Sequence, residues 1–336
     1  MNKERVLVVG QGLTGSVIAL QLKARGHEVW VVDENRKFTS SNVAAGLFNP
    51  IVVGRLKITW NAASLFAHFA NFYLQVEKQL QVSFFHRMPL IHLCKDIEEQ
   101  NDWDVLVGTD KTAVWIEEYH GHFPDYIRSD FGSYLVKSTG WVDLPLFIST
   151  VRKMFQVADR FVVGSPIVGQ DIEIKEHGFL FENSQFDKVF LCRGEFERTQ
   201  PEFPHLPYNP VKGQVFEIET AFELEPTIYH KQVFMLPTGK HSARVGSTYT
   251  WDRMDYEPTQ KETDFLKERL DDFLQGKYAI KEIKAGVRPA FHYGRPMFAE
   301  HEQIKGMYVL NGMGSKGVTL APYYAEQLLN SVYGAE

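Results

Sequence analysis

A glycine fingerprint set between a strand pattern and a helix pattern, within residues 6–34, constrains this chain more than any other feature. Residues 6–9 form a continuous apolar run, as expected for a strand buried on both faces. Gly10, Gly12 and Gly15 follow with the spacing G-x-G-x-x-G. The first glycine permits a tight turn, the second lets the backbone approach a pyrophosphate, and the third allows close packing of a helix on the sheet. The spacing therefore predicts a βαβ unit that binds a dinucleotide.

The residues after the fingerprint complete such a unit. Apolar residues at helical spacing predict a helix over residues 13–25, and Gly26 stands where a helix end favours a left-handed residue. The free N–H groups of its first turn, at Leu13 and Thr14, and its dipole favour a bound phosphate. The next strand delivers Asp33, about 20 residues beyond the last glycine, where an acid would bind a ribose 2′-hydroxyl. Because a carboxylate there would repel a 2′-phosphate, the unit favours FAD or NAD over NADP.

Length and composition describe an ordinary globular protein. The 336 residues are enough for two lobes with separate cores, and 44% of them are hydrophobic. The net charge of −6 provides no basic field for a phosphate backbone, so no nucleic-acid partner is expected. No apolar stretch approaches the roughly 18 residues of a membrane span, and we expect a cytoplasmic protein that does not engage a membrane.

Cys94 and Cys192 are the two cysteines of the chain. They show no metal-ligand spacing, and each lies in an apolar run. We therefore expect two buried free thiols, without a disulfide and without a metal site.

A stretch of small residues, 39–50, follows the second strand. Small side chains permit close approach of the backbone to a ligand, which favours a ligand-lining loop over the alternative of a solvated linker. The residues of this loop expected to contact the ligand are Ser41, Ala44, Ala45 and Gly46.

Helix and strand patterns then alternate along the chain. Apolar stripes predict helices over residues 61–81 and 143–155, the second capped by Asp143. Between them, residues 84–135 have the pattern of short strands separated by turns. Residues 186–194 predict a buried strand that returns to the nucleotide sheet.

The last third of the chain contains a β-rich part and a second glycine loop. Residues 211–249 predict a separate sheet, with Gly213 and Gly239 in turns. A capping box at residues 259–262 opens a helix that is predicted to close at Gly276.

The C-terminal segment repeats the order of strand, glycine loop and helix. Residues 307–310 predict a strand, residues 311–317 a glycine-rich loop, and a helix is expected to open at Pro322 and run to residue 332.

Taken in order, these pieces resemble the D-amino-acid oxidase and glycine oxidase (DAO) family of FAD-dependent oxidoreductases over essentially the whole chain. The C-terminal GSKG with its following Ala-Pro is most similar to the oxidase half of the bifunctional enzyme that finishes a modified uridine at the tRNA wobble position. The matching motifs are the fingerprint, SSNVAAGLFNP, VKGQ at 211–214, AGVRP at 285–289 and NGMGSKGVTLAP at 311–322.

The resemblance implies an α/β fold with two domains. One is a Rossmann-like FAD-binding domain with a parallel central sheet, and the other is an α+β substrate domain with a mostly antiparallel sheet. The chain would cross between them several times, so that the cofactor domain is discontinuous. The implied boundaries are 1–82, 136–208 and 284–336 for the FAD-binding domain, and 83–135 and 209–283 for the substrate domain.

The resemblance also implies roles at the substrate side. Arg288, in AGVRP, would pair with the substrate carboxylate, a task that suits a planar fork of donors; a salt bridge inside the substrate lobe is the alternative. Tyr249 and Tyr229 are candidates for an aromatic wall, each with a packed core role as the alternative. His230 and His292 are further candidates for the pocket, against a structural role.

On the cofactor side, the second glycine loop would face the isoalloxazine ring, where backbone N–H groups stabilise negative charge on the reduced flavin. Lys316 would either touch the carbonyl edge of the flavin or point to water. A main-chain group at residue 167 or 168 would contact the adenine. The cofactor-binding residues that the resemblance adds are Val168, Gly194, Gly312, Gly314, Ser315, Lys316, Gly317 and Val318.

The sequence departs from the family pattern at two places. Residues 290–299 differ from the usual continuation of the Arg-Pro motif, so the substrate side is unusual. The strand expected to end in two alanines and a glycine ends in Cys192, Arg193 and Gly194. Arg193 would either alter FAD affinity or pair with the pyrophosphate. The C-terminal loop has no cysteine, which favours non-covalent FAD.

These features favour an FAD-dependent oxidoreductase that oxidises the C–N bond of an amino acid or an N-substituted glycine-like amine. Hydride would pass to FAD, with dioxygen as the expected acceptor, and the partner would be a small amine with a carboxylate. One alternative is a flavin-binding scaffold or tRNA-modification accessory without free amino-acid oxidase activity. A second is an NAD-dependent dehydrogenase, which leaves AGVRP and NGMGSKGV unexplained.

Overall fold

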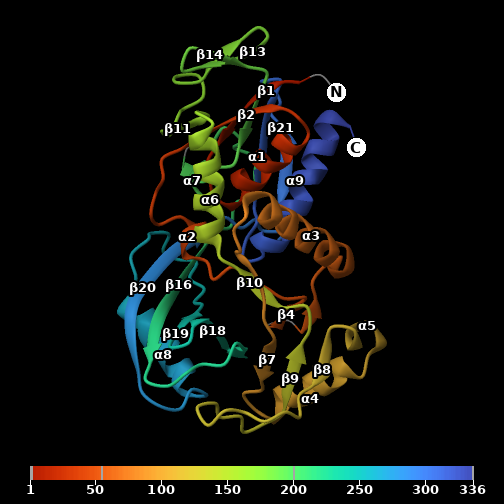
Figure 1. The fold of residues 1–336 in the computed structure, drawn as a ribbon, viewed down its shortest axis with the longest axis vertical. Coiled ribbons are helices and arrows are strands. Elements are labelled where there is room, and N and C mark those ends of the chain that lie inside the picture. Colours follow the sequence, from red (N-terminus) through yellow and green to blue (C-terminus); the bar gives the residue numbers. More distant parts are fainter. Residues whose placement is uncertain (1–2, 54–55, 200, 335–336) are drawn as a thin grey trace.

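Two large β-sheets, one toward each end of the long axis, organise the molecule (Figure 1). The computed structural model describes residues 3–53, 56–199 and 201–334. Together the parallel and antiparallel sheets confirm the predicted α/β class.

The first sheet has six strands drawn from distant parts of the chain. Five are parallel, and the edge strand β21 is antiparallel to its neighbour β22. β1 pairs with β2 on one side and with β15 on the other. The place of β15 confirms the prediction that residues 186–194 form a strand that returns to the nucleotide sheet. The order is β11 (Phe161–Val163), β2 (Glu28–Asp33), β1 (Arg5–Val9), β15 (Lys188–Leu191), β22 (Met307–Asn311) and β21 (Met297–Glu300).

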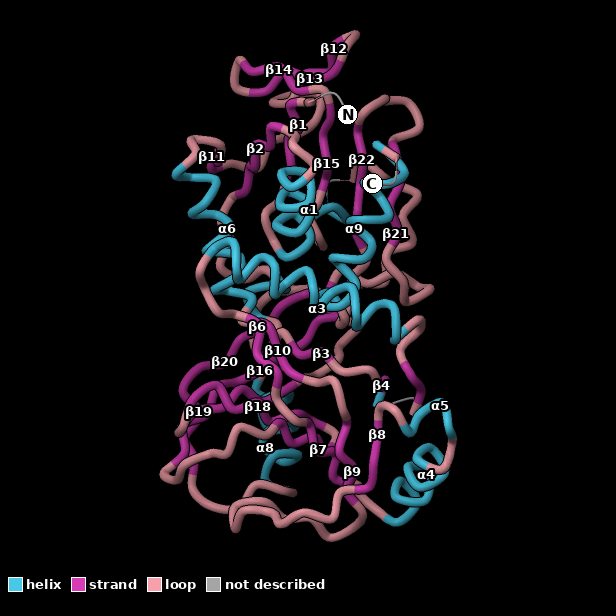
Figure 2. Tube along the Cα trace, turned by 45° about the vertical axis from the view of Figure 1, so that its right-hand side comes forward, coloured by secondary structure: helices cyan, strands magenta, loops and turns pink. Residues whose placement is uncertain are grey.

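Alternate residues of β1 face two different cores. Val6 and Val8 belong to the core formed with the helices α1, α6 and α9, whereas Leu7 and Val9 belong to a core formed with a small antiparallel sheet. In Figure 2, α1 and α9 lie side by side along the six-stranded sheet. The helices are α1 (Leu13–Ala24), α6 (Leu144–Val157) and α9 (Gly317–Tyr333), and the small sheet is β12 (Glu173–Lys175), β13 (Gly178–Phe181) and β14 (Ser184–Phe186).

The second large sheet has eight strands and is mostly antiparallel; only β17 and β7 run parallel. Helix α8 (Gln260–Asp271) packs on it through Leu266 and Leu270. The order is β20 (Tyr278–Arg288), β16 (Val211–Thr220), β19 (Ser242–Gly246), β18 (Val233–Gly239), β17 (Ile228–Lys231), β7 (Leu90–Leu93), β9 (Ser133–Val136) and β8 (Ile116–Glu118).

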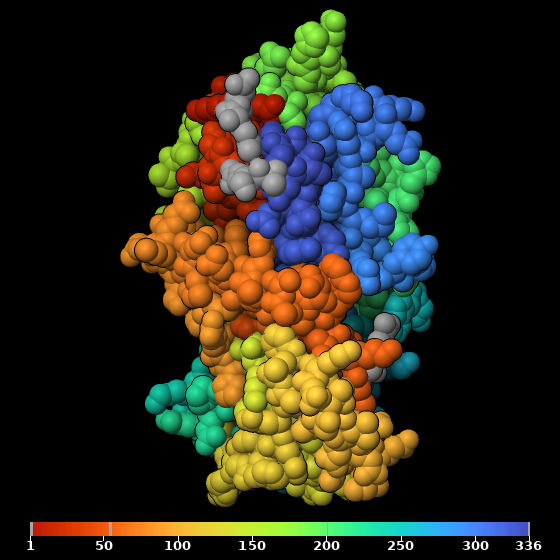
Figure 3. Space-filling view, turned by 90° about the vertical axis from the view of Figure 1, so that its right-hand side faces the viewer, coloured from red at the N-terminus to blue at the C-terminus, as the bar shows by residue number. Residues whose placement is uncertain are grey.

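Shorter elements connect the two sheets. Helix α3 (Ala62–Leu80), close to the predicted 61–81, packs against α9, and in the space-filling view these orange and dark-blue segments adjoin (Figure 3). The small elements are β3 (Leu47–Phe48), β10 (Gly140–Val142), β6 (Phe85–Arg87), β4 (Ile51–Val52), β5 (Lys57–Ile58), α2 (Ser40–Val43), α4 (Ile97–Val107), α5 (Asp110–Ala113) and α7 (Phe196–Thr199).

The domain boundaries stay a prediction. The one placed between residues 283 and 284 falls inside β20, which continues to Arg288 in the eight-stranded sheet. Arg288, predicted for the cofactor-domain side of that boundary, is therefore a residue of the sheet at the opposite end.

The predicted opening of the C-terminal helix at Pro322 is wrong. Helix α9 begins at Gly317, and Pro322 lies inside it. A proline cannot donate to the carbonyl four residues earlier, which is that of Val318. The buried Tyr73 of α3 donates its hydroxyl to the Val318 oxygen at 3.1 Å. The tyrosine thus replaces the missing helical hydrogen bond, and the second glycine loop leads directly into a helix N-terminus.

The strand-like prediction for residues 84–135 missed α4. This helix buries one side chain, Trp103, so it lacks the apolar stripe from which a helix is recognised. Its start carries a signal that the prediction did not use, because Asp96 accepts a hydrogen bond from Glu99 N–H at 2.8 Å. The loop over residues 39–50 likewise contains two short elements, α2 and β3.

Other predicted ends differ less. Asp143 caps α6 by accepting from Leu146 N–H at 3.0 Å, as expected. Helix α8 ends at Asp271, before the predicted stop at Gly276. Cys94 and Cys192 are both buried and free, as expected. No helix formed by the described residues combines the length and apolar character needed to cross a membrane.

Candidate functional site

The fingerprint glycines lie where β1 turns into α1. A Cβ on Gly15 would lie 1.8 Å from the Gly10 carbonyl oxygen, so only glycine lets the helix approach the turn this closely. A Cβ on Gly12 would meet only Ser41 within 4 Å, which leaves the space before α1 open. Gly12 also provides no side-chain cap for the helix. The Leu13 N–H, predicted to be free for a phosphate, donates instead to Ser41 Oγ at 3.1 Å. The helix start otherwise lacks a side-chain cap from Gly12 and suits the phosphates of a dinucleotide.

Asp33 ends β2 beside this turn. Its carboxylate accepts from the N–H groups of Gln11 and Asn35, each at 2.7 Å. Arg152 of α6 lies 3.4 Å from the same carboxylate and donates to the Gln11 side chain at 2.7 Å. Burial lowers the pKa of Arg152, and Asp33 opposes that effect. Sequence reasoning missed Arg152, because its contacts with residues 11 and 33 span more than a hundred positions.

The small-residue stretch is attached to three parts of the molecule. Ser41 Oγ accepts from Leu13 N–H at 3.1 Å, which places it at the start of α1. The Ala44 carbonyl accepts from Arg244 at 3.0 Å, and the Gly46 carbonyl accepts from Val142 N–H at 3.0 Å. Ala45, between these attachments, is buried. The stretch therefore runs from the fingerprint toward the eight-stranded sheet, and its contact with a ligand stays a prediction.

The second glycine loop meets both the fingerprint and the Arg-Pro motif. A Cβ on Gly317 would lie 3.0 Å from the Leu13 side chain. Gly314 N–H donates to the Pro289 carbonyl at 2.9 Å. The side chain of Asn311 donates to the Gly194 carbonyl at 2.7 Å. The contact between Gly317 and Leu13 joins residues about 300 positions apart, so the two glycine loops lie side by side.

Lys316, at the N-terminal end of α9, points into the protein and not to water. Its ammonium donates to the hydroxyl of the buried Thr59. Burial lowers the pKa of Lys316 to about 8. Within the described residues, no carboxylate forms an ion pair with it. This contact argues against the alternative in which Lys316 points to water, and contact with the carbonyl edge of the flavin stays a prediction.

Arg288 ends β20 with its guanidinium against the backbone of β16. It donates to the Thr248 carbonyl at 3.1 Å, to the Lys212 carbonyl at 3.4 Å and to Ser247 Oγ at 2.8 Å. Burial lowers the pKa of Arg288. No carboxylate forms an ion pair with it in the ranges 3–53, 56–199 and 201–334, so the alternative of a salt bridge inside the lobe receives no support.

Gly213 explains how the guanidinium fits. A Cβ at this position would lie 2.3 Å from both terminal nitrogens of Arg288. The prediction of Gly213 in a turn is wrong, since it lies within β16 opposite Gly286 of β20. Its role is to leave room for the arginine.

Tyr249 covers the same guanidinium. The centroid of its ring lies 4.4 Å from the Arg288 guanidinium carbon, a cation–π contact. The acid that acts on Arg288 over a longer range is Glu262, which accepts hydroxyl hydrogen bonds from Thr248 at 2.8 Å and Thr250 at 2.6 Å. Burial opposes ionisation of Glu262, but these hydroxyls lower the pKa of the carboxyl overall.

Several candidates lie apart from this assembly. Tyr229 is buried in the core of the eight-stranded sheet, and His230 beside it contacts His92 through ring nitrogens 3.1 Å apart. His292 lies exposed in the departing segment. Arg193 forms a buried ion pair with Glu197 at 2.6 Å, a partner other than the pyrophosphate.

The positions of the remaining predicted cofactor residues neither support nor oppose a role in binding the cofactor. Val168 packs against the sheet face that holds Leu7 and Val9, and the neighbouring Gly169 N–H donates to the Ile172 carbonyl at 2.9 Å. In the first turns of α1 and α9, Thr14 is partly exposed and Val318 is buried. Ser315, in the second glycine loop, is exposed.

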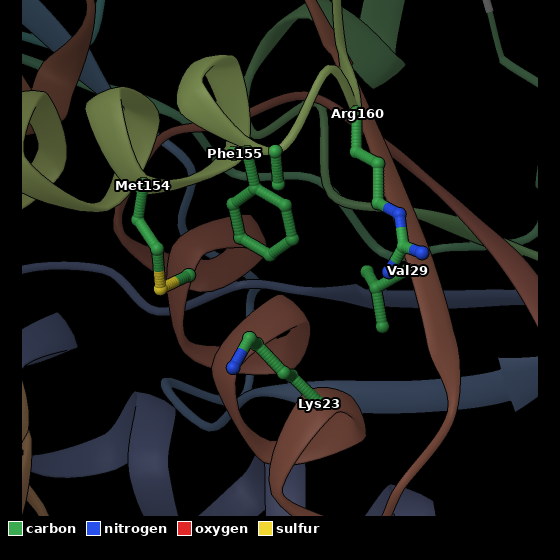
Figure 4. A pocket seen from close by; sticks show the side chains of 6 residues that line it. Lys23, Val29, Met154, Phe155 and Arg160 are labelled. Atoms are coloured by element: carbon green, nitrogen blue, oxygen red, sulfur yellow. The ribbon is translucent and has the colours of Figure 1, made fainter.

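A small hollow on the outside of the molecule is separate from these residues. It is lined by side chains of α1, β2, α6 and the segment that follows α6, among them Lys23, Phe155 and Arg160 (Figure 4). Lys23 lies in the last turn of α1, roughly 15 Å along the helix from Leu13. The hollow therefore lies at the end of α1 that is far from the fingerprint.

A model of the DAO family, described as FAD dependent oxidoreductase, matches residues 5–330. The chain belongs to this family. Members of this family bind FAD, whose pyrophosphate suits the N-terminus of α1. The match also excludes the alternative of an NAD-dependent dehydrogenase.

Individual members of the family show how far the likeness extends. The glycine oxidase of Pseudomonas putida is 24% identical over 366 residues, covering 100% of this chain and 96% of that protein. The bifunctional tRNA 5-methylaminomethyl-2-thiouridine biosynthesis protein MnmC of Legionella pneumophila (strain Corby) is 22% identical over 97% of this chain. The chain spans 54% of the length of that relative.

Solved structures of two oxidases share the fold. Glycine oxidase from Bacillus cereus superposes with a TM-score of 0.82 at 19% identity, covering 99% of this chain and 96% of that one. Iminodiacetate oxidase from Chelativorans sp. BNC1 superposes with a TM-score of 0.79, also at 19% identity, with the same coverage.

Proposed function

We propose that this FAD-dependent oxidoreductase oxidises the C–N bond of a small amine that carries a carboxylate. The observation that carries the proposal is Arg288, a partly buried guanidinium without an ion-pairing carboxylate among the described residues. A buried cation is costly unless an anion joins it, so the site favours an anionic ligand. The names of two similar proteins, glycine oxidase and iminodiacetate oxidase, also refer to amines with carboxylates.

Arg288 has donors left for such a ligand. A guanidinium carries five N–H groups, and three are directed to Thr248, Lys212 and Ser247. Two remain within the described part of the chain, enough for a two-point hydrogen bond to a carboxylate. Arg288 would thus fix the substrate by its acid group, while Tyr249 shields the guanidinium from water.

The cofactor would be held by the two glycine loops without a covalent bond. Gly10, Gly12 and Gly15 with Ser41 would receive the pyrophosphate, and Asp33 the ribose. The second loop would face the flavin ring through Gly312, Gly314, Ser315, Gly317 and Val318, with the main chain at Val168 on the adenine and Ala44, Ala45, Gly46 and Gly194 lining the path between. FAD supplies the acceptor for the hydride that leaves the α-carbon of the amine.

Lys316 and the start of α9 would place positive potential at the flavin end of the site. The burial that lowers the pKa of Lys316 to about 8 leaves the ammonium form populated at neutral pH. A buried ammonium beside a helix N-terminus stabilises negative charge that develops during the reaction. The protein needs no further base if the amine binds in its neutral form, and dioxygen is the expected final acceptor.

The test starts from the visible spectrum of the purified protein. We expect absorption at about 450 nm from non-covalent flavin, which acid or heat should release into the supernatant. Peroxide release is then measured with glycine, sarcosine and iminodiacetate. Turnover of at least one of these amines supports the proposal. If FAD is bound but none of the carboxylate-bearing amines reduces it in the absence of oxygen, the proposal fails and the scaffold alternative is favoured. The cytoplasmic location and the lack of a nucleic-acid partner stay predictions.

A further inference from the structure

Two exposed aromatic rings lie beside the Arg288 site. Tyr249 and Trp251 are 52% and 59% exposed, their ring centroids are 6.2 Å apart, and their planes differ by 25°. We call this pair the aromatic ledge. Large aromatic side chains that face water on neighbouring positions are typical of binding surfaces.

The direction of the rings follows from the residue between them. Thr250 points inward, where its hydroxyl donates to Glu262 at 2.6 Å. Successive side chains of an extended segment alternate in direction, so Tyr249 and Trp251 share the other side. The chain thus presents both rings outward together.

The backbone under the ledge is fixed. Thr250 and Lys212 exchange two backbone hydrogen bonds, of 2.9 and 3.0 Å. The fully buried Lys212 then donates to the Asp255 carboxylate and the Glu257 carbonyl, both at 2.6 Å, and so anchors the next turn of the segment. Rings on an anchored backbone lose little conformational freedom when a ligand stacks on them.

The ledge is continuous with the proposed carboxylate site. Tyr249 contributes one ring to the ledge and also covers the Arg288 guanidinium, 4.4 Å from its centroid. A substrate held by its carboxylate at Arg288 would therefore lie beside Tyr249, whose ring adjoins that of Trp251.

We propose that the aromatic ledge binds a planar aromatic ring carried by the substrate, on its nitrogen or on its α-carbon. This inference rests on the proposed function, since Arg288 supplies the anchor from which the ring reaches the ledge. Planar rings stack on Tyr and Trp in offset or edge arrangements that a saturated ring of similar size cannot reproduce. The specificity is therefore for planarity and not for bulk alone.

A binding experiment tests the ledge independently of turnover. Calorimetric titration of the FAD-loaded protein compares phenylacetate with cyclohexylacetate, which have the same carboxylate and carbon skeleton. We expect phenylacetate to bind about three- to tenfold more tightly. Trp251→Ala should abolish the preference and Trp251→Phe should keep most of it. Phe131→Ala, at an exposed aromatic residue of another loop, serves as the matched control and should change neither affinity. Equal affinities in the wild type, or a preference that survives Trp251→Ala, would overturn the proposal.

Turnover locates the ring on the substrate. A preference for N-benzylglycine over N-(cyclohexylmethyl)glycine supports a ring on nitrogen, and a preference for phenylalanine over cyclohexylalanine supports a ring on the α-carbon. Turnover of both pairs without either preference contradicts the ledge. If no amine reduces the flavin but phenylacetate still binds more tightly than cyclohexylacetate, the proposed oxidase function is wrong, while binding of a planar ring at the aromatic ledge is supported.

Discussion

The guanidinium of Arg288 lies between Gly213 of the eight-stranded sheet and the aromatic ring of Tyr249, in the segment that follows β19. Its carbon lies 4.4 Å from the centroid of Tyr249, which follows β19, and its terminal nitrogens lie where a Cβ of Gly213 would be. The charge is thus placed by β20, β16 and the segment that follows β19, and no acid of the described chain pairs with it. This arrangement underlies the first two predictions.

Replacement of Arg288 by lysine should mainly weaken substrate binding. A lysine keeps the charge but loses the planar pair of donors that a carboxylate needs. Hydrogen bonds to charged groups contribute about 1.5–3 kcal/mol, so KM should rise about 10- to 100-fold, with kcat less affected. Steady-state kinetics measure the effect, and the flavin spectrum monitors loading. Arg295→Lys, at an exposed arginine, is the matched control; an unchanged KM in Arg288→Lys would remove this residue from the site.

Gly213→Ala should have a related effect without touching Arg288 itself. The new methyl group would overlap both terminal nitrogens, so the guanidinium must move. We expect a KM increase of about tenfold, comparable to the loss of one charged hydrogen bond. At Gly239, a Cβ would meet only the movable hydroxyl of Ser242, and Gly239→Ala should leave KM unchanged. Equal KM values for the two variants would show that the close contact at Gly213 is irrelevant.

Tyr73→Phe should destabilise the protein by removing a hydrogen bond to α9, the helix that follows the second glycine loop. It leaves the Val318 carbonyl without the hydroxyl donor, at a cost of about 1–2 kcal/mol. Pro322→Ala supplies a backbone N–H four residues after Val318, so the cost of Tyr73→Phe should shrink in that background. Urea unfolding of the four proteins in the cycle measures the coupling. Additive free energies would mean that the tyrosine does not substitute for the helical bond.

Lys316 should give stability a distinctive pH dependence. The folded pKa of about 8 lies below the ordinary value of 10.5, because burial penalises the charged form. The penalty is complete below pH 8 and is relieved as pH rises from 8 to about 10.5, where the unfolded lysine also loses its proton. Lys316→Met should therefore stabilise the apoprotein at pH 7.5 and much less at pH 9.5. Denaturant unfolding at the two pH values checks this; a stability difference independent of pH would contradict the burial effect.

Local patterns predicted the cofactor end of the fold well. The order of strand, fingerprint, helix and acid was sufficient for β1, α1 and Asp33, because each step rests on contacts between near neighbours. Helix α6 followed from its apolar stripe and its Asp143 cap for the same reason. In contrast, α4 buries only Trp103 and has no stripe to reveal it.

The features that the sequence could not predict depend on contacts between distant residues. The place of Pro322 inside α9 depends on Tyr73, which no pattern links to it. The inward turn of Lys316 depends on Thr59, 257 positions away. Gly213 was assigned to a turn because a strand glycine is recognisable only once Arg288 is seen beside it. Composition and spacing carry no trace of these long-range pairings.

The central claim is that an amine is oxidised while Arg288 holds its carboxylate. In the most direct measurement, the flavin-loaded protein is mixed with sarcosine or with dimethylamine in the absence of oxygen, and the absorbance at about 450 nm is followed. The account predicts bleaching by the carboxylate-bearing amine, little by dimethylamine, and loss of the difference in Arg288→Met. Equal bleaching by both amines, or a preference for sarcosine that persists in Arg288→Met, would contradict it.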